Sequence, residues 1–97
     1  MNITAEKNNG ICKMQIEGEM TIFNAEEIKE KMFEGMKDCS AVELDLSKVN
    51  EMDTSGFQLL YLASRDSAVS SRSFSITVQG SVSENVLELF NMKTEEF

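Results

Sequence analysis

The sequence contains no histidine and no proline, and its five glycines are widely spaced. Without histidine, the most common general base is missing, together with the usual Ser/His/Asp triad and most zinc and non-haem iron sites. No GxxxxGKS, GxxxxGKT or GxGxxG motif is present to cradle a phosphate. These absences argue against catalysis and against a metal or other cofactor, and we expect neither.

Basic residues are scarce. Nine lysines and arginines stand against 17 aspartates and glutamates, which gives a formal net charge of −8. This charge disfavours direct binding to nucleic acid or to an anionic membrane and is easier to reconcile with a neutral or basic protein partner. A charge of this size also serves solubility alone. Adjacent acids such as Glu26 and Glu27 are typical of a solvated helix face rather than of a catalytic pair.

Long apolar runs and clustered cysteines are also missing. No segment approaches the roughly 20 apolar residues that span a membrane, and residues 1–10 are polar where a signal peptide would need an apolar core. Cys12 and Cys39 lack CxxC spacing, so reduced, packed thiols are expected rather than a disulfide. We therefore expect a cytoplasmic protein that does not insert into membranes.

What the sequence does contain is strand-like periodicity in several short segments. Apolar and polar residues alternate over residues 11–16, 41–46 and 73–78, which predicts three half-buried strands, the first ending before Gly18. A weaker strand is predicted around residues 3–6. The turn sequence Asn8, Asn9, Gly10 would join it to the next strand as a hairpin.

Helical periodicity separates these strands. Asn24 followed by Glu27 matches a capping pattern, and apolar residues at three- and four-residue intervals predict a helix over residues 25–36. A second helical run extends over residues 57–67, directly after the polar segment that follows the central strand. Strand, loop and helix together form a βα unit.

A further helix is predicted after Ser83, with residues 93–97 as a frayed tail. The order of elements is two strands, helix, strand, helix, strand, helix. It indicates a single α/β domain with an N-terminal hairpin, a four- to five-stranded mixed, partly parallel sheet and three to four helices packed on it.

Four landmarks occur in order along the chain. They are residues 18–28 at the passage into the first helix, residues 42–49 in the central strand, the segment D-T-S-G-F-Q-L-L over residues 53–60, and residues 74–83 at the last strand and helix. In order and spacing they resemble the STAS family, the sulfate-transporter and anti-sigma-factor-antagonist domain. The resemblance implies that residues 1–97 form one such domain.

The resemblance also implies a control point. In phosphorylatable members, a partner kinase modifies the serine directly before the signature glycine, which corresponds here to Ser55, with Thr54 as the second candidate. The unmodified protein would bind an anti-sigma factor that has serine kinase activity, phosphorylation would break the complex, and a phosphatase would restore it. The chain is then a ligand and substrate, a monomer or weak dimer, and no enzyme. The residues expected to contact the partner are Asp53, Thr54, Ser55, Gly56, Phe57 and Gln58.

A serine at this place can work as a switch. The first amides of a helix carry partial positive charge and can accommodate a phosphate, whereas its added charge of about −1.5 to −2 beside Asp53 opposes a partner. Gly56 lets another backbone approach closely. The same Asp, Thr and Ser also fit ordinary capping of a helix, so both interpretations of the segment stand.

Two other functions are compatible with the sequence. Many family members with the pattern D-T-x-G-x-Q-L-L have alanine at the serine position, and Gln58 places this chain near that branch. The branch implies a non-phosphorylated scaffold subunit of a chemotaxis-like signalling or lipid-transport complex, docking through residues 53–60. Nucleotide binding by the domain itself is a third possibility, on family analogy alone.

Overall fold

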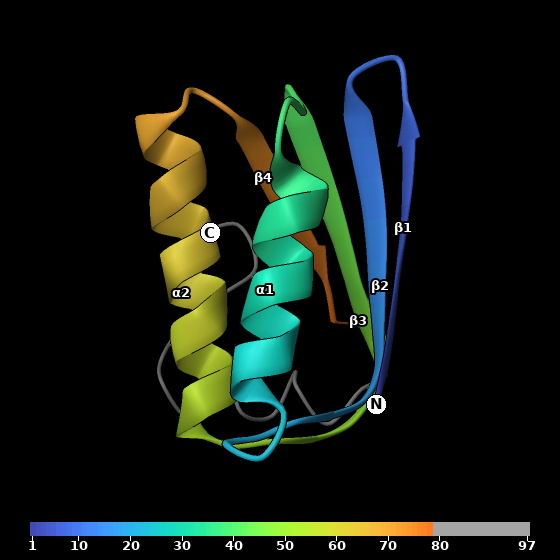
Figure 1. Cartoon of the computed structure of the whole chain (residues 1–97), viewed down its shortest axis with the longest axis vertical. Helices are drawn as coiled ribbons and strands as arrows, with labels where there is room; N and C mark the ends of the chain where they lie inside the picture. The colour runs from blue at the N-terminus through green and yellow to red at the C-terminus, as the bar shows by residue number, and fades with distance from the viewer. Residues whose placement is uncertain (79–97) are drawn as a thin grey trace.

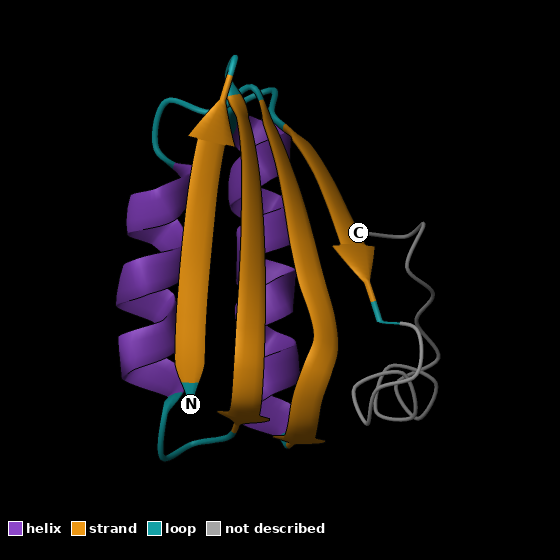
Figure 2. Cartoon of the chain, turned by 90° about the vertical axis from the view of Figure 1, so that its right-hand side faces the viewer, coloured by secondary structure: helices purple, strands orange, loops and turns teal. Residues whose placement is uncertain are grey.

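The computed structural model describes residues 1–78, which form a β-sheet covered on one face by two helices (Figure 1). Figure 2 views the sheet from its other face, with both helices behind it. This is the α/β architecture that the sequence predicts. The elements follow in the order β1 (Asn2–Asn8), β2 (Ile11–Met20), α1 (Ala25–Met36), β3 (Ala41–Met52), α2 (Thr54–Val69) and β4 (Ser73–Thr77).

The sheet is mixed, with the strand order β1-β2-β3-β4. β1 pairs antiparallel with β2, whereas β3 pairs in parallel with both β2 and β4. The turn between β1 and β2 is formed by Asn9 and Gly10, whose φ values of 52° and 80° are both positive, as a type I′ turn requires. The predicted hairpin and the predicted partly parallel sheet are therefore confirmed.

The core lies between the sheet and the helices. Alternate residues of the central strands point toward the helices, and each helix packs side chains at intervals of three and four residues against the sheet. The periodicity seen in the sequence therefore identifies most of the core correctly. The buried residues of these four elements include Cys12, Met14 and Ile16 of β2, Ile28, Met32 and Met36 of α1, Val42, Leu44 and Leu46 of β3, and Leu59, Leu60 and Ala63 of α2.

Two strands run further than their predicted ends. β2 continues to Met20 through Gly18, which has a φ of 105°, and register shifts against β3 occur on both sides of this glycine. β3 likewise continues to Met52. Gly18 is thus a bulge position inside the ladder rather than a boundary, because an irregularity can be absorbed without ending the strand.

α1 occupies the predicted residues, but its predicted cap is wrong. The side chain of Asn24 caps no amide of the helix, and its Nδ2 instead donates to the carbonyl oxygen of Glu19 at 3.1 Å. Asn24 already has a helical backbone conformation, whereas capping side chains usually stand on an extended residue. Residues 1–78 contain two helices rather than three to four. The helix predicted after Ser83 and the tail lie outside the described residues.

Both thiols are buried near the last turn of α1. Cys12 Sγ and Cys39 Sγ each donate to the carbonyl oxygen of Gly35, at 3.1 and 3.4 Å, and both cysteines are free. Burial, with a further contribution from the neighbouring Cys39, raises the pKa of Cys12 to about 11. Because the thiolate is the reactive form, this environment suppresses reaction with electrophiles.

We expect the thiols to react with dithionitrobenzoate only after unfolding, because both are buried and because at pH 8 only about one part in a thousand of the Cys12 thiol is ionised. Native protein should release little colour over minutes, and the same sample in concentrated guanidinium should release two equivalents. The raised pKa also means that the contribution of Cys12 to stability is complete below about pH 9 and is lost as the pH approaches about 11. Rapid labelling of native protein at pH 8 would contradict this account.

Candidate functional site

The predicted site lies at the carboxyl-terminal edge of the sheet, where β2 and β3 end side by side. Met20 and Met52, the last residues of these strands, are register partners. The chain leaves β2 into the loop of residues 21–24 and leaves β3 through Asp53 into α2, so both connections lie at one end of the molecule, the lower end in Figure 1. Binding sites of open α/β sheets form at this edge.

Asp53 is the N-cap of α2 and joins the two connections. Its Oδ1 accepts hydrogen bonds from the backbone N–H of Ser55 at 2.9 Å and of Gly56 at 3.3 Å. Its Oδ2 accepts from the backbone N–H of Ile22 at 3.0 Å. An extended backbone, with φ −115° and ψ −171°, allows the carboxylate to reach the first turn. The capping interpretation is therefore correct for Asp53, which also anchors the neighbouring loop.

The structure brings the predicted site residues into the cap and first turn of α2, but with different exposures. Thr54 and Gln58 are exposed, and Ser55 is half-buried. Phe57 is half-buried and packs against the core, and Gly56 is buried. Thr54, Ser55 and Gln58 therefore offer polar groups at the surface, while the glycine and the phenylalanine hold the turn on the sheet.

Gly56 is required by packing inside the chain. A Cβ at this position would meet the backbone carbonyl oxygen of Met20 and would lie 2.8 Å from Cγ of Met52. The backbone that approaches this glycine is thus the end of β2, whereas the sequence suggested room for a partner's backbone. This close approach brings the start of α2, and with it Ser55, against the edge of the sheet.

Two surface residues beside the site have no counterpart in the sequence prediction. Ile22 is 64% exposed and Phe23 is 89% exposed, both in the loop that Asp53 anchors. Large apolar side chains at such exposure are often found at interaction surfaces. A signal was available, because these residues follow the last predicted strand position and precede the apolar stripe of α1.

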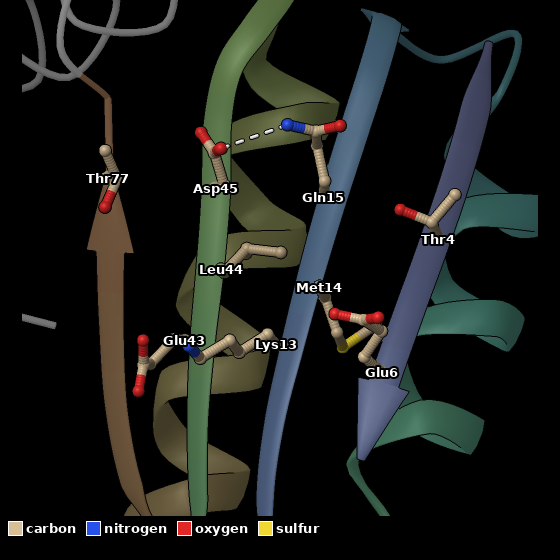
Figure 3. Close-up of a pocket in the computed structure, with 9 residues that line it drawn as sticks. All are labelled: Thr4, Glu6, Lys13, Met14, Gln15, Glu43, Leu44, Asp45 and Thr77. Atoms are coloured by element: carbon tan, nitrogen blue, oxygen red, sulfur yellow. Dashed lines mark hydrogen bonds between the residues drawn. The ribbon is translucent and has the colours of Figure 1, made fainter. Parts of the chain in front are cut away.

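A polar hollow of about 520 Å³ lies on the sheet face opposite the helices (Figure 3). Gln15 Nε2 donates to Asp45 Oδ2 at 3.0 Å, and the backbone N–H of Ser47 donates to Asp45 Oδ1 at 2.8 Å. Hydrogen bonds from Ser47, with a smaller contribution from Gln15, lower the pKa of Asp45. These groups satisfy one another, as is typical of a polar sheet surface, and none of the predicted site residues lines the hollow.

Among residues 1–78, no three His, Cys, Asp or Glu side chains are grouped so that they could hold a metal ion. No helix within the same residues is long and apolar enough to cross a membrane.

The model of the STAS domain family matches residues 2–94 of this chain. The match covers all four sequence landmarks, including the whole of the segment from Asp53 to Leu60. The comparison with the sequences of curated proteins finds no match.

Solved structures share this fold at low sequence identity. The anti-sigma factor antagonist SpoIIAA in its unphosphorylated form has a TM-score of 0.69 and 18% identity, over 98% of this chain and 92% of its own. An anti-sigma factor antagonist from Mycobacterium paratuberculosis has a TM-score of 0.78 and 20% identity, over 93% and 79%. The crystal structure of Mglu has a TM-score of 0.67 and 16% identity over 75% of this chain, which spans only 18% of that protein.

Replacement of Gly56 by alanine should destabilise the protein. Alanine gains up to about 1 kcal/mol over glycine in a helix, but overpacking of a core costs about 1–3 kcal/mol, and here one obstacle is backbone that cannot rotate away. We expect a net loss of about 1–2 kcal/mol in the free energy of unfolding, measured by urea denaturation. Gly35→Ala is the matched control, because its Cβ would meet no backbone atom: its nearest neighbours are the flexible end of Met14, at 3.1 Å, and Cβ of Ala5 at an ordinary 3.7 Å. A Gly56→Ala variant as stable as Gly35→Ala would contradict the packing argument.

Substitutions of Asp53 should separate its two roles. Asp53→Ala removes the acceptors of three backbone amides and should lower the free energy of unfolding by about 1–2 kcal/mol. Asp53→Asn keeps one carbonyl oxygen for the cap but turns an NH₂ group toward the N–H of Ile22. It should therefore retain most of the stability while amide exchange at Ile22 accelerates. Unchanged exchange in both variants would show that Asp53 does not hold the loop.

Proposed function

The chain belongs to the STAS domain family, and from this premise we propose that it is a regulatory protein-binding module, an anti-sigma factor antagonist controlled by phosphorylation of Ser55. The observation that carries the proposal is the position of Ser55. It is half-buried in the first turn of α2, two residues after Asp53, the aspartate that already provides the cap. The serine hydroxyl is therefore not needed to start the helix.

The capping arrangement supports a modifiable hydroxyl. Within residues 1–78, the hydrogen bond between Ser55 and Asp53 uses the backbone N–H of the serine. Asp53 performs the structural task that the sequence alone could have assigned to any of three residues. Thr54 is exposed beside it and stays the second candidate for modification.

A phosphate on Ser55 would act mainly on binding. The backbone amides of Ser55 and Gly56, which could otherwise donate hydrogen bonds to the phosphate, already donate to Asp53. The added charge of about −1.5 to −2 would then lie beside a carboxylate, at the surface where a partner docks. Repulsion and the cost of desolvating the phosphate both disfavour the complex, while the core below stays intact.

The proposed partners follow from this switch. The unmodified protein binds an anti-sigma factor with serine kinase activity in the cytoplasm, and this binding releases a sigma factor. Phosphate transfer to Ser55 ends the complex, and a phosphatase regenerates the binding form. The docking surface comprises Thr54, Ser55 and Gln58, with Asp53, Gly56 and Phe57 positioning them.

A second function is favoured by the exposure of Gln58. This residue lies one turn beyond Thr54 on the surface of α2 and could contact a partner without any modification. The chain would then be a constitutive scaffold subunit of a chemotaxis-like signalling or lipid-transport complex. Co-purification with a receptor or an ABC ATPase that is insensitive to substitution of Ser55 would favour it.

The proposal is tested with purified kinases of the anti-sigma type encoded in the same genome. Incubation with ATP should place one phosphate on Ser55, detected by mass spectrometry. Ser55→Ala should stay bound in the presence of ATP, whereas Ser55→Asp should bind at least about tenfold more weakly because it adds a charge beside Asp53. Gln58→Ala is the comparison, since it changes the docking surface but keeps the Ser55 hydroxyl that accepts the phosphate. Absence of transfer from every kinase, or equal affinities of the two Ser55 variants, would refute the switch.

A further inference from the structure

The loop of residues 21–24 carries two adjacent exposed apolar side chains, and the elements at this end of the molecule carry exposed acids. Ile22 and Phe23 are 64% and 89% exposed, and Glu19, Glu26 and Glu51 are exposed around the same end of β2 and β3. We call these five residues the acid-rimmed patch. None of the ion pairs found among residues 1–78 involves its three glutamates.

Two of the rim glutamates lie opposite each other on neighbouring strands. Glu19 of β2 and Glu51 of β3 are register partners in the parallel ladder, so their side chains leave the sheet on the same face. Like charges directly opposite each other in a sheet are destabilising. Nearer the middle of the same strands, Glu17 lies opposite Lys48 with an N–O distance of 3.9 Å, so the charge pattern changes toward the site.

The loop also contains a buried hydroxyl group, that of Thr21. Thr21 is 6% exposed, and its Oγ1 is a buried oxygen for which residues 1–78 offer no hydrogen-bond partner. A buried hydroxyl in this state is destabilising, because it has lost its hydrogen bonds to water. An exposed phenylalanine, an acidic pair and an unsatisfied hydroxyl thus occur within one short region. Such local conflicts are expected where a surface serves binding rather than folding.

The patch and Ser55 share one anchor. Asp53 Oδ2 accepts from the N–H of Ile22, while its Oδ1 accepts from the N–H of Ser55. The backbone before Phe23 and the backbone of Ser55 are therefore held by the same carboxylate. A phosphate on Ser55 would repel the carboxylate that holds the loop, so the modification acts on both parts of the surface.

We infer that the acid-rimmed patch is the second half of the docking surface. Phe23, with Ile22, enters an apolar pocket bordered by lysine or arginine on the same kinase that binds Ser55, so the inference rests on the proposed function. Charge complementarity selects this occupant. The uncompensated rim repels a second copy of this acidic chain and repels an anionic lipid surface, whereas basic groups around an apolar pocket match both its chemistry and its sign.

Photo-crosslinking locates the contact directly. p-Benzoylphenylalanine is placed at position 23, 58 or 69 of the full chain, which is then irradiated with the kinase that phosphorylates Ser55. Val69 is a matched control because it is 84% exposed and apolar, yet it lies about 20 Å along α2 from the first turn. Crosslinks to the kinase from positions 23 and 58, but not from 69, support the inference.

Affinity provides the second readout. Phe23→Ala should weaken kinase binding at least about tenfold, as expected for an aromatic anchor, and Val69→Ala should change it less than about twofold. Both side chains are exposed, so the urea midpoints of both variants should match the wild type. Glu19→Gln combined with Glu51→Gln should also weaken binding and should reduce its dependence on salt concentration.

The outcomes separate the two proposals. A crosslink from position 58 without one from 23, or full affinity in Phe23→Ala, overturns the patch while Ser55 docking stands. Crosslinks from position 23 to a second copy of the chain also overturn it, because they identify a self-association surface. If neither position reaches any kinase and the wild type binds none, the proposed function fails and the patch fails with it.

Discussion

The site depends on the hydrogen bonds that the carboxylate of Asp53 accepts. This carboxylate accepts from three backbone amides that belong to two connections, the start of α2 and the loop after β2. Hydrogen bonds to a charged acceptor are stronger than those between neutral groups. The backbone N–H of the same residue donates to the carbonyl oxygen of Met20, at 3.3 Å. The end of one strand, the start of one helix and the adjacent loop are therefore fixed relative to one another by a single residue.

The spacing of apolar residues predicted the elements of this fold, because a strand or helix that is buried on one face needs apolar residues at regular intervals. α1, the hairpin and the partly parallel sheet follow from spacing and turn chemistry that are local in sequence. The extent of β2 could not be predicted in the same way. Whether Gly18 ends a strand or forms a bulge depends on the ladder with β3, and that partner is remote in sequence.

Helix capping likewise could not be predicted from the residue type alone. Asn24 and Asp53 both precede helices and both have the right chemistry, yet only Asp53 has the extended backbone that turns its side chain onto the first amides. Gly56 is a similar case, because the need for glycine arises from the carbonyl oxygen of Met20 across the sheet edge. The segment of residues 53–58 could be chosen as a candidate site from the sequence. Which of its residues cap the helix, which pack on the sheet, and that Phe23 is exposed in the adjacent loop could be seen only in the tertiary structure.

The burial of the two thiols has a practical consequence. Cys12 and Cys39 are the only cysteines of the chain, and both are shielded near the last turn of α1. A cysteine introduced at an exposed position of α2, such as Gln58→Cys, would be the one thiol that a maleimide dye can reach in the native protein. Such a probe would report docking and release in real time by fluorescence, with both natural sulfurs left in place.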